Sequence, residues 1–285
     1  DRVEVRKTYK LFIGGAFARS ESGRTFEVRA ADGRFLANAA HASRKDARNA
    51  VVAARKGFDS WSAATAYNRG QVLYRVAEVL EGRRDQFATE LQAAGASAAE
   101  ASAEVDTAID RWVWYSGWTD KFAQVFGSAN PVAGPYFNFS VPEPTGVVVV
   151  AAPDRPSLLG LVSVIAPALA TGNSVIALAS RTMPLPAITL TEVLATSDVP
   201  AGVVNVLTGD RAEVLPWLAA HADVNGIDLA GVDDPDLART LTVDSAGTLK
   251  RVRGARVAQR WAADPGLAGL RAFVETKTVW HPQGV

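Results

Sequence analysis

Cysteine is absent from this sequence of 285 residues. Its absence excludes disulfide bonds, thiolate metal ligands and any thiol nucleophile within the chain. Histidine is scarce as well: His41, His221 and His281 are far apart in sequence, so a histidine-based metal site is not expected. Neither sign of charge is in excess, since the net charge is 0, and no basic cluster indicates a nucleic-acid surface.

Long apolar runs are lacking too. No stretch reaches the roughly 20 apolar residues that a membrane-spanning helix needs. The first residues, DRVEVRKTYK, are charged, whereas a secretory signal has an apolar segment. From these features we expect a soluble cytoplasmic protein with neither a nucleic-acid nor a membrane partner.

Apolar residues nevertheless make up 48% of the chain, which is enough for a sizeable core. Near the N-terminus, short apolar runs alternate with glycine-containing turn signals, and this predicts strands joined by tight turns. A helix is predicted from Ser43, with Asp46 in the capping-box position, and another over 67–82. A further helix is predicted from Ser97 to about Phe126, and its three tryptophans have a helical spacing typical of core packing.

Strands and helices alternate in the second half of the chain. Continuous apolar strands separated by helices of roughly ten to fifteen residues are typical of a parallel sheet that is covered on both faces. The predicted fold class is therefore α/β, a Rossmann-like open parallel sheet covered by helices, with an added β-ribbon. The predicted strands are 147–151, 174–178, 203–207 and 226–230, and the predicted helices are 157–170, 184–196 and 211–221.

Several segments, in order along the chain, carry a family resemblance. They are LFIGGAF near the N-terminus, EPTGVVVV at 143–150, LVSVIAPALATGNSV at 161–175, PAGVVNVLTGD at 200–210 and HADVNGIDLAGV at 221–232. Together with AFVETKTVWHPQG near the end, they resemble the aldehyde dehydrogenase superfamily over about the first 232 residues and the last dozen. RWVWYSGWTDKF and VAGPYFNFSVPEPTG resemble more narrowly the degenerate second units of long, duplicated aldehyde dehydrogenases.

The resemblance implies an active-site turn after the first core strand, where the family reads roughly Pro-Trp-Asn-Phe-Pro. The Asn of that turn stabilises an oxyanion, and such a donor contributes about a hundred- to a thousandfold in rate. The matching residues here are Pro153-Asp154-Arg155-Pro156-Ser157, so Arg155 takes the place of the Asn. We do not expect Arg155 to replace it in catalysis, because a guanidinium differs from an amide in reach and orientation.

The resemblance also implies a dinucleotide at the ends of the second and fourth core strands. The family's Lys-Pro-Ser-Glu, which holds the adenosine ribose, is replaced by LASR at 178–181. Arg181 could instead favour a 2′-phosphate, as basic residues do in other dinucleotide folds, whereas Leu178 in place of the Lys weighs against this. The family's Thr-Gly-Ser is replaced by AGV at 230–232, which keeps the glycine and loses both hydroxyls.

These substitutions all remove polar partners of one ligand. We therefore interpret the pocket as a vestigial NAD(P) site and expect no bound cofactor, no metal and no catalytic residue. The family's cysteine nucleophile is absent, and so is the Glu-Leu-Gly-Gly motif that supplies its general base. The residues of the predicted vestigial site are Arg155, Leu178, Ser180, Arg181, Gly209, Gly231 and Val232.

Two further polar positions are interpreted as structural. Asp228 lies inside a predicted strand, and we expect it to form a buried ion pair with Arg155 or Lys250. The sequence GDR at 209–211 precedes a predicted helix and is interpreted as its N-terminal cap, with an acid near the positive end of the helix.

The resemblance implies a division of the chain into three parts. Residues 1–134 and 146–245 are predicted to form the N-terminal strands and helices and the dinucleotide-binding-like α/β domain. Residues 135–145 and 270–285 are predicted to be oligomerisation strands. Residues 246–269 are predicted to be a short connection in the place of the family's catalytic domain.

We predict from these features a non-catalytic aldehyde dehydrogenase-like subunit, a pseudoenzyme. It is expected to assemble with an active aldehyde dehydrogenase paralogue, or with itself, through strands 135–145 and 272–280, because in the family such strands extend the sheet of a neighbouring subunit. One alternative is a binding module that retains weak NAD(P) binding. The other is an NAD(P)-dependent aldehyde oxidoreductase with a different nucleophile, which the absence of cysteine disfavours.

Overall fold

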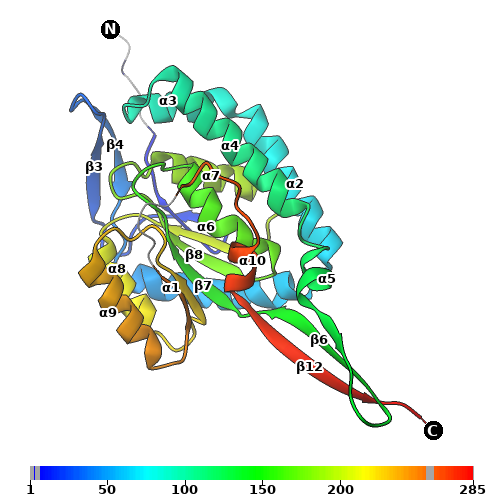
Figure 1. Ribbon diagram of the computed structural model, residues 1–285. Coiled ribbons are helices and arrows are strands. Elements are labelled where there is room, and N and C mark those ends of the chain that lie inside the picture. Colours follow the sequence, from blue (N-terminus) through cyan, green and yellow to red (C-terminus); the bar gives the residue numbers. More distant parts are fainter. Residues whose placement is uncertain (1–2, 4–6, 255–259, 285) are drawn as a thin grey trace.

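The central sheet of the computed structural model has seven strands in the order β11-β10-β7-β8-β9-β1-β2 (Figure 1). The structure describes residue 3 and residues 7–254 and 260–284, so part of the predicted 246–269 connection lies outside the described residues. β1 (Leu11–Ile13) and β2 (Ala16–Ala18) are antiparallel to their neighbours. The parallel strands are β7 (Val147–Ala151), β8 (Ser174–Leu178), β9 (Val204–Leu207), β10 (Gly226–Asp228) and β11 (Arg251–Arg253).

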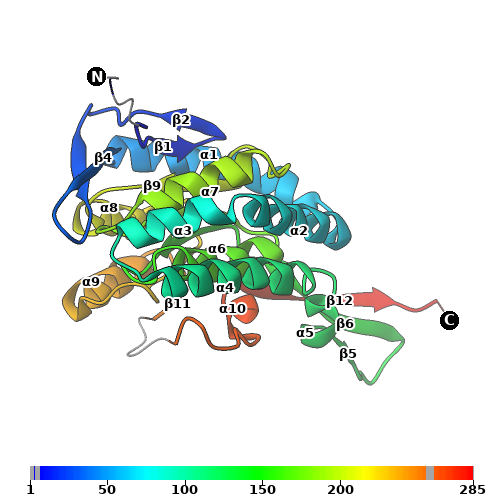
Figure 2. The same ribbon diagram turned by 90° about the horizontal axis from the view of Figure 1, so that it is seen from above.

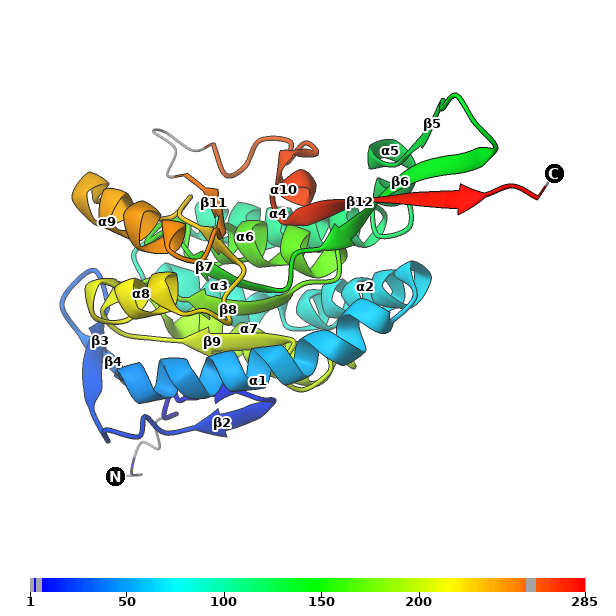
Figure 3. The same cartoon turned by 90° about the horizontal axis from the view of Figure 1, so that it is seen from below.

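The predicted α/β class is confirmed, because helices cover both faces of this sheet (Figures 2 and 3). Alternate residues of β7 point to opposite faces, so that Val148 and Val150 lie in one core and Val147 and Val149 in the other. One face is covered by α2 (Ala66–Gly82), α3 (Arg84–Ala93), α4 (Ala98–Ser116), α6 (Leu159–Ala170) and α7 (Leu185–Ala195). The other face is covered by α1 (Arg44–Ala63), α8 (Arg211–Ala220) and α9 (Pro235–Ala246).

Capping residues fix the starts of two long helices as the sequence predicts. Ser43 caps α1 and Ser97 caps α4, and in each case an acid at the third helical position accepts the backbone N–H of the cap in return. α4 ends at Ser116, so the prediction that this helix continues to Phe126 is wrong. The Thr119 hydroxyl donates to the Ser116 carbonyl at 2.9 Å, and the chain turns there before the short helix α5 (Phe122–Phe126).

A β-ribbon projects from the body of the molecule (Figure 3). β6 (Tyr136–Pro144) pairs antiparallel with β12 (Val274–Pro282) along its whole length, and β5 (Ser128–Asn130) lies on the other side of β6. Tyr136 and Trp280 pack edge to face across the two strands, with ring centroids 5.8 Å apart, and both side chains are exposed. The ribbon therefore presents both an open backbone edge and aromatic surface.

The structure also contains smaller elements outside the central sheet and the ribbon. β3 (Thr25–Arg29) and β4 (Phe35–Ala40) form a separate two-stranded sheet, and α10 (Ala268–Ala272) packs against α6 just before β12. None of the helices in residues 7–254 and 260–284 is both long and apolar enough to cross a membrane. The cytoplasmic location and the three-part division of the chain stay predictions.

Candidate functional site

The strand order reverses at the carboxyl ends of β7 and β10, and the space outside these strand ends is called the crevice below. β8 and β9 extend the sheet on one side of β7, whereas β10 and β11 extend it on the other, so the order of the strands reverses between β7 and β10. In open parallel α/β sheets, ligands bind outside the carboxyl ends of the strands at such a point. The turn after β7, residues 152–157, borders this crevice and is the candidate site.

Asp154 ties the turn after β7 to the loop after β8. Its carboxylate accepts the backbone N–H of Arg181 at 2.7 Å, and its backbone carbonyl accepts the hydroxyl of Ser180 at 3.0 Å. The Arg181 guanidinium lies 3.8 Å from the second carboxylate oxygen, and its side chain is 64% exposed. The first oxygen also accepts Nη2 of Arg211 at 3.1 Å. One carboxylate therefore faces two guanidinium groups.

Arg211, at the start of α8, reaches the segments that follow β7 and β10 and is only 8% exposed. Its Nη1 donates to the carbonyl of Gly231, beyond β10, at 3.1 Å, and its Nη2 donates to the carbonyl of Ala152, beyond β7. Its Nε is buried and has no hydrogen-bond partner within the described part of the chain. Burial lowers the pKa of Arg211, whereas the carboxylates of Asp154 and Asp233 act to raise it. The guanidinium thus bridges the two strands between which the order reverses.

The sequence does not reveal this role of Arg211. The cap expected over 209–211 is present, because the Asp210 side chain accepts the Ala212 N–H at 2.9 Å. One physical signal was available: a cation in the first turn of a helix faces the positive end of the helix dipole, so it needs acceptors elsewhere. The structure supplies those acceptors from the segments that follow β7 and β10.

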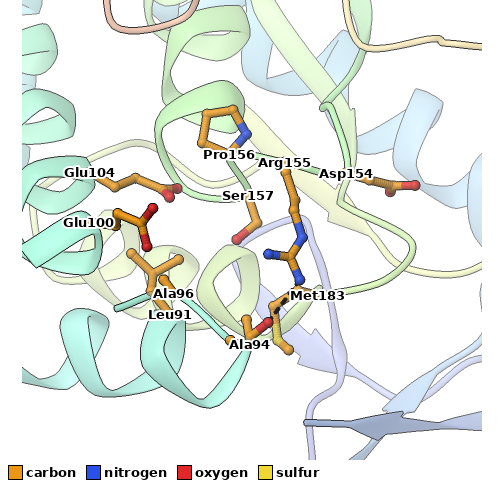
Figure 4. A pocket seen from close by; sticks show the side chains of 11 residues that line it. Leu91, Ala94, Ala96, Glu100, Glu104, Asp154, Arg155, Pro156, Ser157 and Met183 are labelled. Carbon is orange, nitrogen blue, oxygen red and sulfur yellow. Dashed lines mark hydrogen bonds between the residues drawn. The ribbon is translucent and has the colours of Figure 1, made fainter. Parts of the chain in front are cut away.

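A cavity of about 420 Å³ lies on the other side of the turn, against α4 and the loop before it (Figure 4). Glu100 and Glu104 approach this cavity from α4, and Arg155 and Ser157 face them from the turn. Nη2 of Arg155 donates to the carbonyl of Ala94 at 2.8 Å. Arg155 therefore belongs to the cavity and is separated from the crevice that holds Arg211.

Glu104 occupies the N-terminus of α6. Its Oε1 accepts the backbone N–H groups of Leu158 at 2.8 Å and Leu159 at 3.2 Å. Burial raises the pKa of Glu104, although these two backbone donors act to lower it. Because a helix N-terminus is a favourable place for an anion, the chain's own carboxylate fills a position that an external anion would otherwise use.

Asp228 is buried in β10 and pairs with Arg253 of β11, whose Nη1 lies 2.7 Å from its Oδ2. The prediction that Asp228 pairs with Arg155 or Lys250 is wrong, since Lys250 donates to Thr248 and Arg155 lies at the cavity. The reason is register: β10 and β11 are parallel with Asp228 directly opposite Arg253. The ambiguous sequence pattern after β10 did not reveal β11 or its register.

The other residues of the predicted vestigial site are dispersed. Leu178 is fully buried at the end of β8, and Val232 is also buried. Gly209 has a φ of 131° and lies against the backbone before α1. A Cβ on Gly231 would lie 2.3 Å from the Ala151 carbonyl oxygen, so only glycine fits beside β7. The residues of the set that the structure gathers at the crevice are Ser180, Arg181 and Gly231.

The sheet and its crevice define a Rossmann-like α/β protein of the kind that holds a ligand where the strand order reverses. The chain belongs to the aldehyde dehydrogenase family, and the profile described as "Aldehyde dehydrogenase family" matches residues 17–253. The resemblance seen in the sequence motifs is therefore confirmed. Within the described ranges, no group of three or more histidine, cysteine, aspartate or glutamate side chains could hold a metal ion.

Three relatives show how much of the family the chain covers. Cytosolic 10-formyltetrahydrofolate dehydrogenase of Pongo abelii is 33% identical over 237 residues, which is 80% of this chain and 26% of that protein. The structure of PnpE in complex with nicotinamide adenine dinucleotide matches with a TM-score of 0.81 at 27% identity, over 86% of this chain and 50% of that one. A point mutant of betaine aldehyde dehydrogenase from Staphylococcus aureus, in complex with NAD+, matches with a TM-score of 0.81 at 25% identity, over 86% and 49%. The chain thus spans about half the length of these solved relatives.

The prediction that no cofactor is bound is wrong, because relatives with this fold are seen in complex with the dinucleotide. That prediction weighed the side-chain partners lost at positions such as Leu178 and Val232. A dinucleotide fold also binds through the shape of its crevice and through backbone groups, which do not depend on those side chains. In this chain the strand ends also bring two guanidinium groups, those of Arg181 and Arg211, to the Asp154 carboxylate.

Proposed function

We propose that this chain is a non-catalytic unit of the aldehyde dehydrogenase family, which pairs with an active aldehyde dehydrogenase through the β6–β12 ribbon and supports it. The ribbon is the observation that carries the proposal. β12 lies at the edge of its sheet, and an edge strand presents N–H and C=O groups that a strand of another chain can extend. Tyr136, Phe137 and Trp280 are exposed there and add apolar surface for the partner to cover.

Two features support the absence of aldehyde oxidation by this chain on its own. It contains no cysteine, so no thiolate is present to attack an aldehyde. In addition, the turn after β7 offers no amide side chain for an oxyanion. The guanidinium of Arg155 donates to the Ala94 carbonyl, and Glu104, across the cavity, accepts the N–H groups at the start of α6.

Affinity purification of the tagged chain from its native cells tests this proposal. We expect an aldehyde dehydrogenase to co-purify, and we expect the separated chain to form no NADH from aldehydes once trace enzyme has been removed. Recovery of the chain as a monomer without such a partner contradicts the assembly. Aldehyde oxidation by the separated chain contradicts its non-catalytic role.

A second function, the binding of a nicotinamide dinucleotide, is supported by the crevice. Its donor set fits such a ligand, because guanidinium groups are strong phosphate donors and two of them lie there. Arg181 is the more accessible of the two, because its side chain is mostly exposed, whereas Arg211 is buried. A bound nicotinamide ring would supply a hydride acceptor, whereas the part of this chain is to bind and orient the phosphates.

Fluorescence offers a direct test of that second function. The chain has seven tryptophans, so energy transfer from them to the nicotinamide of NADH should be measurable. We expect saturable transfer, and the absence of any change at millimolar NADH contradicts binding.

A further inference from the structure

A second cavity lies in the N-terminal part of the fold. It has a volume of about 330 Å³ and lies between the chain before β1, the turn that joins β2 to β3, and β4. β3 and β4 are at the opposite end of the molecule from the β6–β12 ribbon (Figures 1 and 2). A ligand in this cavity therefore does not compete with a partner that is bound to the ribbon.

The walls of this cavity are fixed by hydrogen bonds within the protein. Before β1, the N–H of Tyr9 donates to the Asn38 carbonyl at 3.3 Å, and the carbonyl of Tyr9 accepts the Ala40 N–H at 2.9 Å. The turn between β2 and β3 is tied to the start of α1, because the buried carboxylate of Asp46 accepts the Ser20 hydroxyl at 2.7 Å. A cavity that is formed in advance needs little ordering when a ligand binds.

The cations that line the cavity differ in whether the protein itself neutralises them. Arg24 forms an ion pair with Glu213 of α8 at 2.5 Å. The side chains of Lys10 and Arg19 make no hydrogen bond or ion pair with a residue of the described ranges. The two positive charges therefore lie at the cavity without a counterion from that part of the chain.

The other polar groups of the cavity favour an anionic ligand that also carries hydroxyl groups. The carboxylate of Glu21 lines the cavity, but it is paired with Lys45 of α1 and leaves the two free cations unopposed. Thr8, Thr25 and Asn38 line the cavity as well, and each of their side chains can both donate and accept a hydrogen bond. Such groups match the hydroxyls of a sugar or polyol.

We propose that this cavity binds a phosphorylated sugar or polyol, whose phosphate is held by Lys10 and Arg19. A phosphomonoester is close to doubly charged, so it balances both cations, whereas a monocarboxylate leaves one of them unpaired. The hydroxylated body of the ligand contacts Thr8, Thr25 and Asn38. The volume of about 330 Å³ falls within the range of small-molecule sites, roughly 300–1,000 Å³. This site is independent of the assembly and of the dinucleotide binding proposed above.

Isothermal titration calorimetry of the full chain with glucose 6-phosphate tests the proposal. We expect saturable binding, and we expect glucose and inorganic phosphate each to bind at least about tenfold more weakly, because each makes only part of the contacts. Lys10→Gln and Arg19→Gln should each weaken glucose 6-phosphate about tenfold, as the loss of one charge-assisted contact implies. Added salt should weaken it as well, because Arg19 is exposed.

Two matched controls remove a positive charge elsewhere. Lys56→Gln, at an exposed lysine of α1, and Arg181→Gln, at the crevice, should each leave the affinity for glucose 6-phosphate within about twofold of wild type. If glucose 6-phosphate does not bind, or if Lys10→Gln and Arg19→Gln bind it as tightly as wild type, the cavity is not such a site. Equally tight binding of inorganic phosphate contradicts the contacts to the sugar. A loss with Arg181→Gln as large as that with Arg19→Gln places the phosphate at the crevice and refutes the proposal.

Discussion

Arg211 is a buried cation whose acceptors come from three segments of the chain. They are the carbonyl after β7, the carbonyl after β10 and the side chain of Asp154. An isolated charge in this position would be costly, so these contacts keep the guanidinium ionised where it is. Replacing Arg211 should therefore lower the free energy of unfolding substantially.

Arg211→Leu should lower the free energy of unfolding by about 2–3 kcal/mol, because it leaves two buried carbonyl groups and the Asp154 carboxylate without their shared donor. Urea denaturation followed by tryptophan fluorescence measures this loss. Arg239→Leu, at an arginine whose side chain is 78% exposed, should stay within about 0.5 kcal/mol of wild type. An unchanged midpoint for Arg211→Leu would show that the contacts are not stabilising.

The sequence located part of this site and missed its contacts. The motif positions of Ser180, Arg181 and Gly231 follow from where their strands end, which the apolar runs reveal. Arg211 and Glu104 were missed, because the partners of Glu104 and two of the three partners of Arg211 are more than 50 residues away in the chain and become neighbours only when the sheet and helices pack.

At the scale of elements, α6 is apolar apart from Ser163 and all its residues are buried, so it has no solvent to satisfy its first N–H groups. No side chain of its own caps it, and the carboxylate of Glu104 from α4 does so instead. Burial raises the pKa of Glu104, so the folded protein binds a proton there more readily than the unfolded chain. Stability contributed by this group therefore increases as pH falls and decreases as pH rises through its raised pKa.

Glu104→Gln should remove this part of the pH dependence, because the amide oxygen still accepts the N–H groups of α6 and does not titrate. The unfolding free energy of wild type, measured relative to the variant, should increase as pH falls from neutral through the raised pKa. Urea denaturation of both proteins at a series of pH values measures the difference, and the shifts of other acids cancel between them. If the difference in unfolding free energy between the two proteins stays constant with pH, Glu104 does not have a raised pKa in the folded protein.

Boundaries of elements were less predictable than their existence. The strand expected over 226–230 ends at Asp228, because the Asp228 carboxylate accepts the Ala230 N–H at 2.9 Å and turns the backbone out of the sheet. A run of apolar residues indicates a buried segment, whereas the residue at which pairing stops depends on such local contacts.

At the scale of the whole molecule, the ribbon and α9 lie on different sides of the body (Figure 1). Trp280→Glu places a charge on the exposed aromatic surface of the ribbon and should reduce co-purification of the aldehyde dehydrogenase at least tenfold, which corresponds to about 1.4 kcal/mol. Quantitative affinity purification of the tagged variants measures this reduction.

Val243→Glu is the matched control, because it changes an exposed apolar residue of α9 to the same charged residue away from the ribbon. Both substitutions are at exposed positions and should alter the unfolding free energy by no more than about 0.5 kcal/mol. Equal recovery of the partner with both variants would show that the ribbon is not the interface.

The sequence by itself determined the α/β class, the strand and helix order from β7 to β10 and the family, because these depend on apolar periodicity and on motifs that are local in the chain. The tertiary structure alone decided which side chains meet at the crevice. There Arg211 lies across β7 and β10, Asp154 between two arginines and Glu104 at the start of α6. Such contacts join residues far apart in sequence, and they follow from the packing of whole elements, which no short pattern encodes.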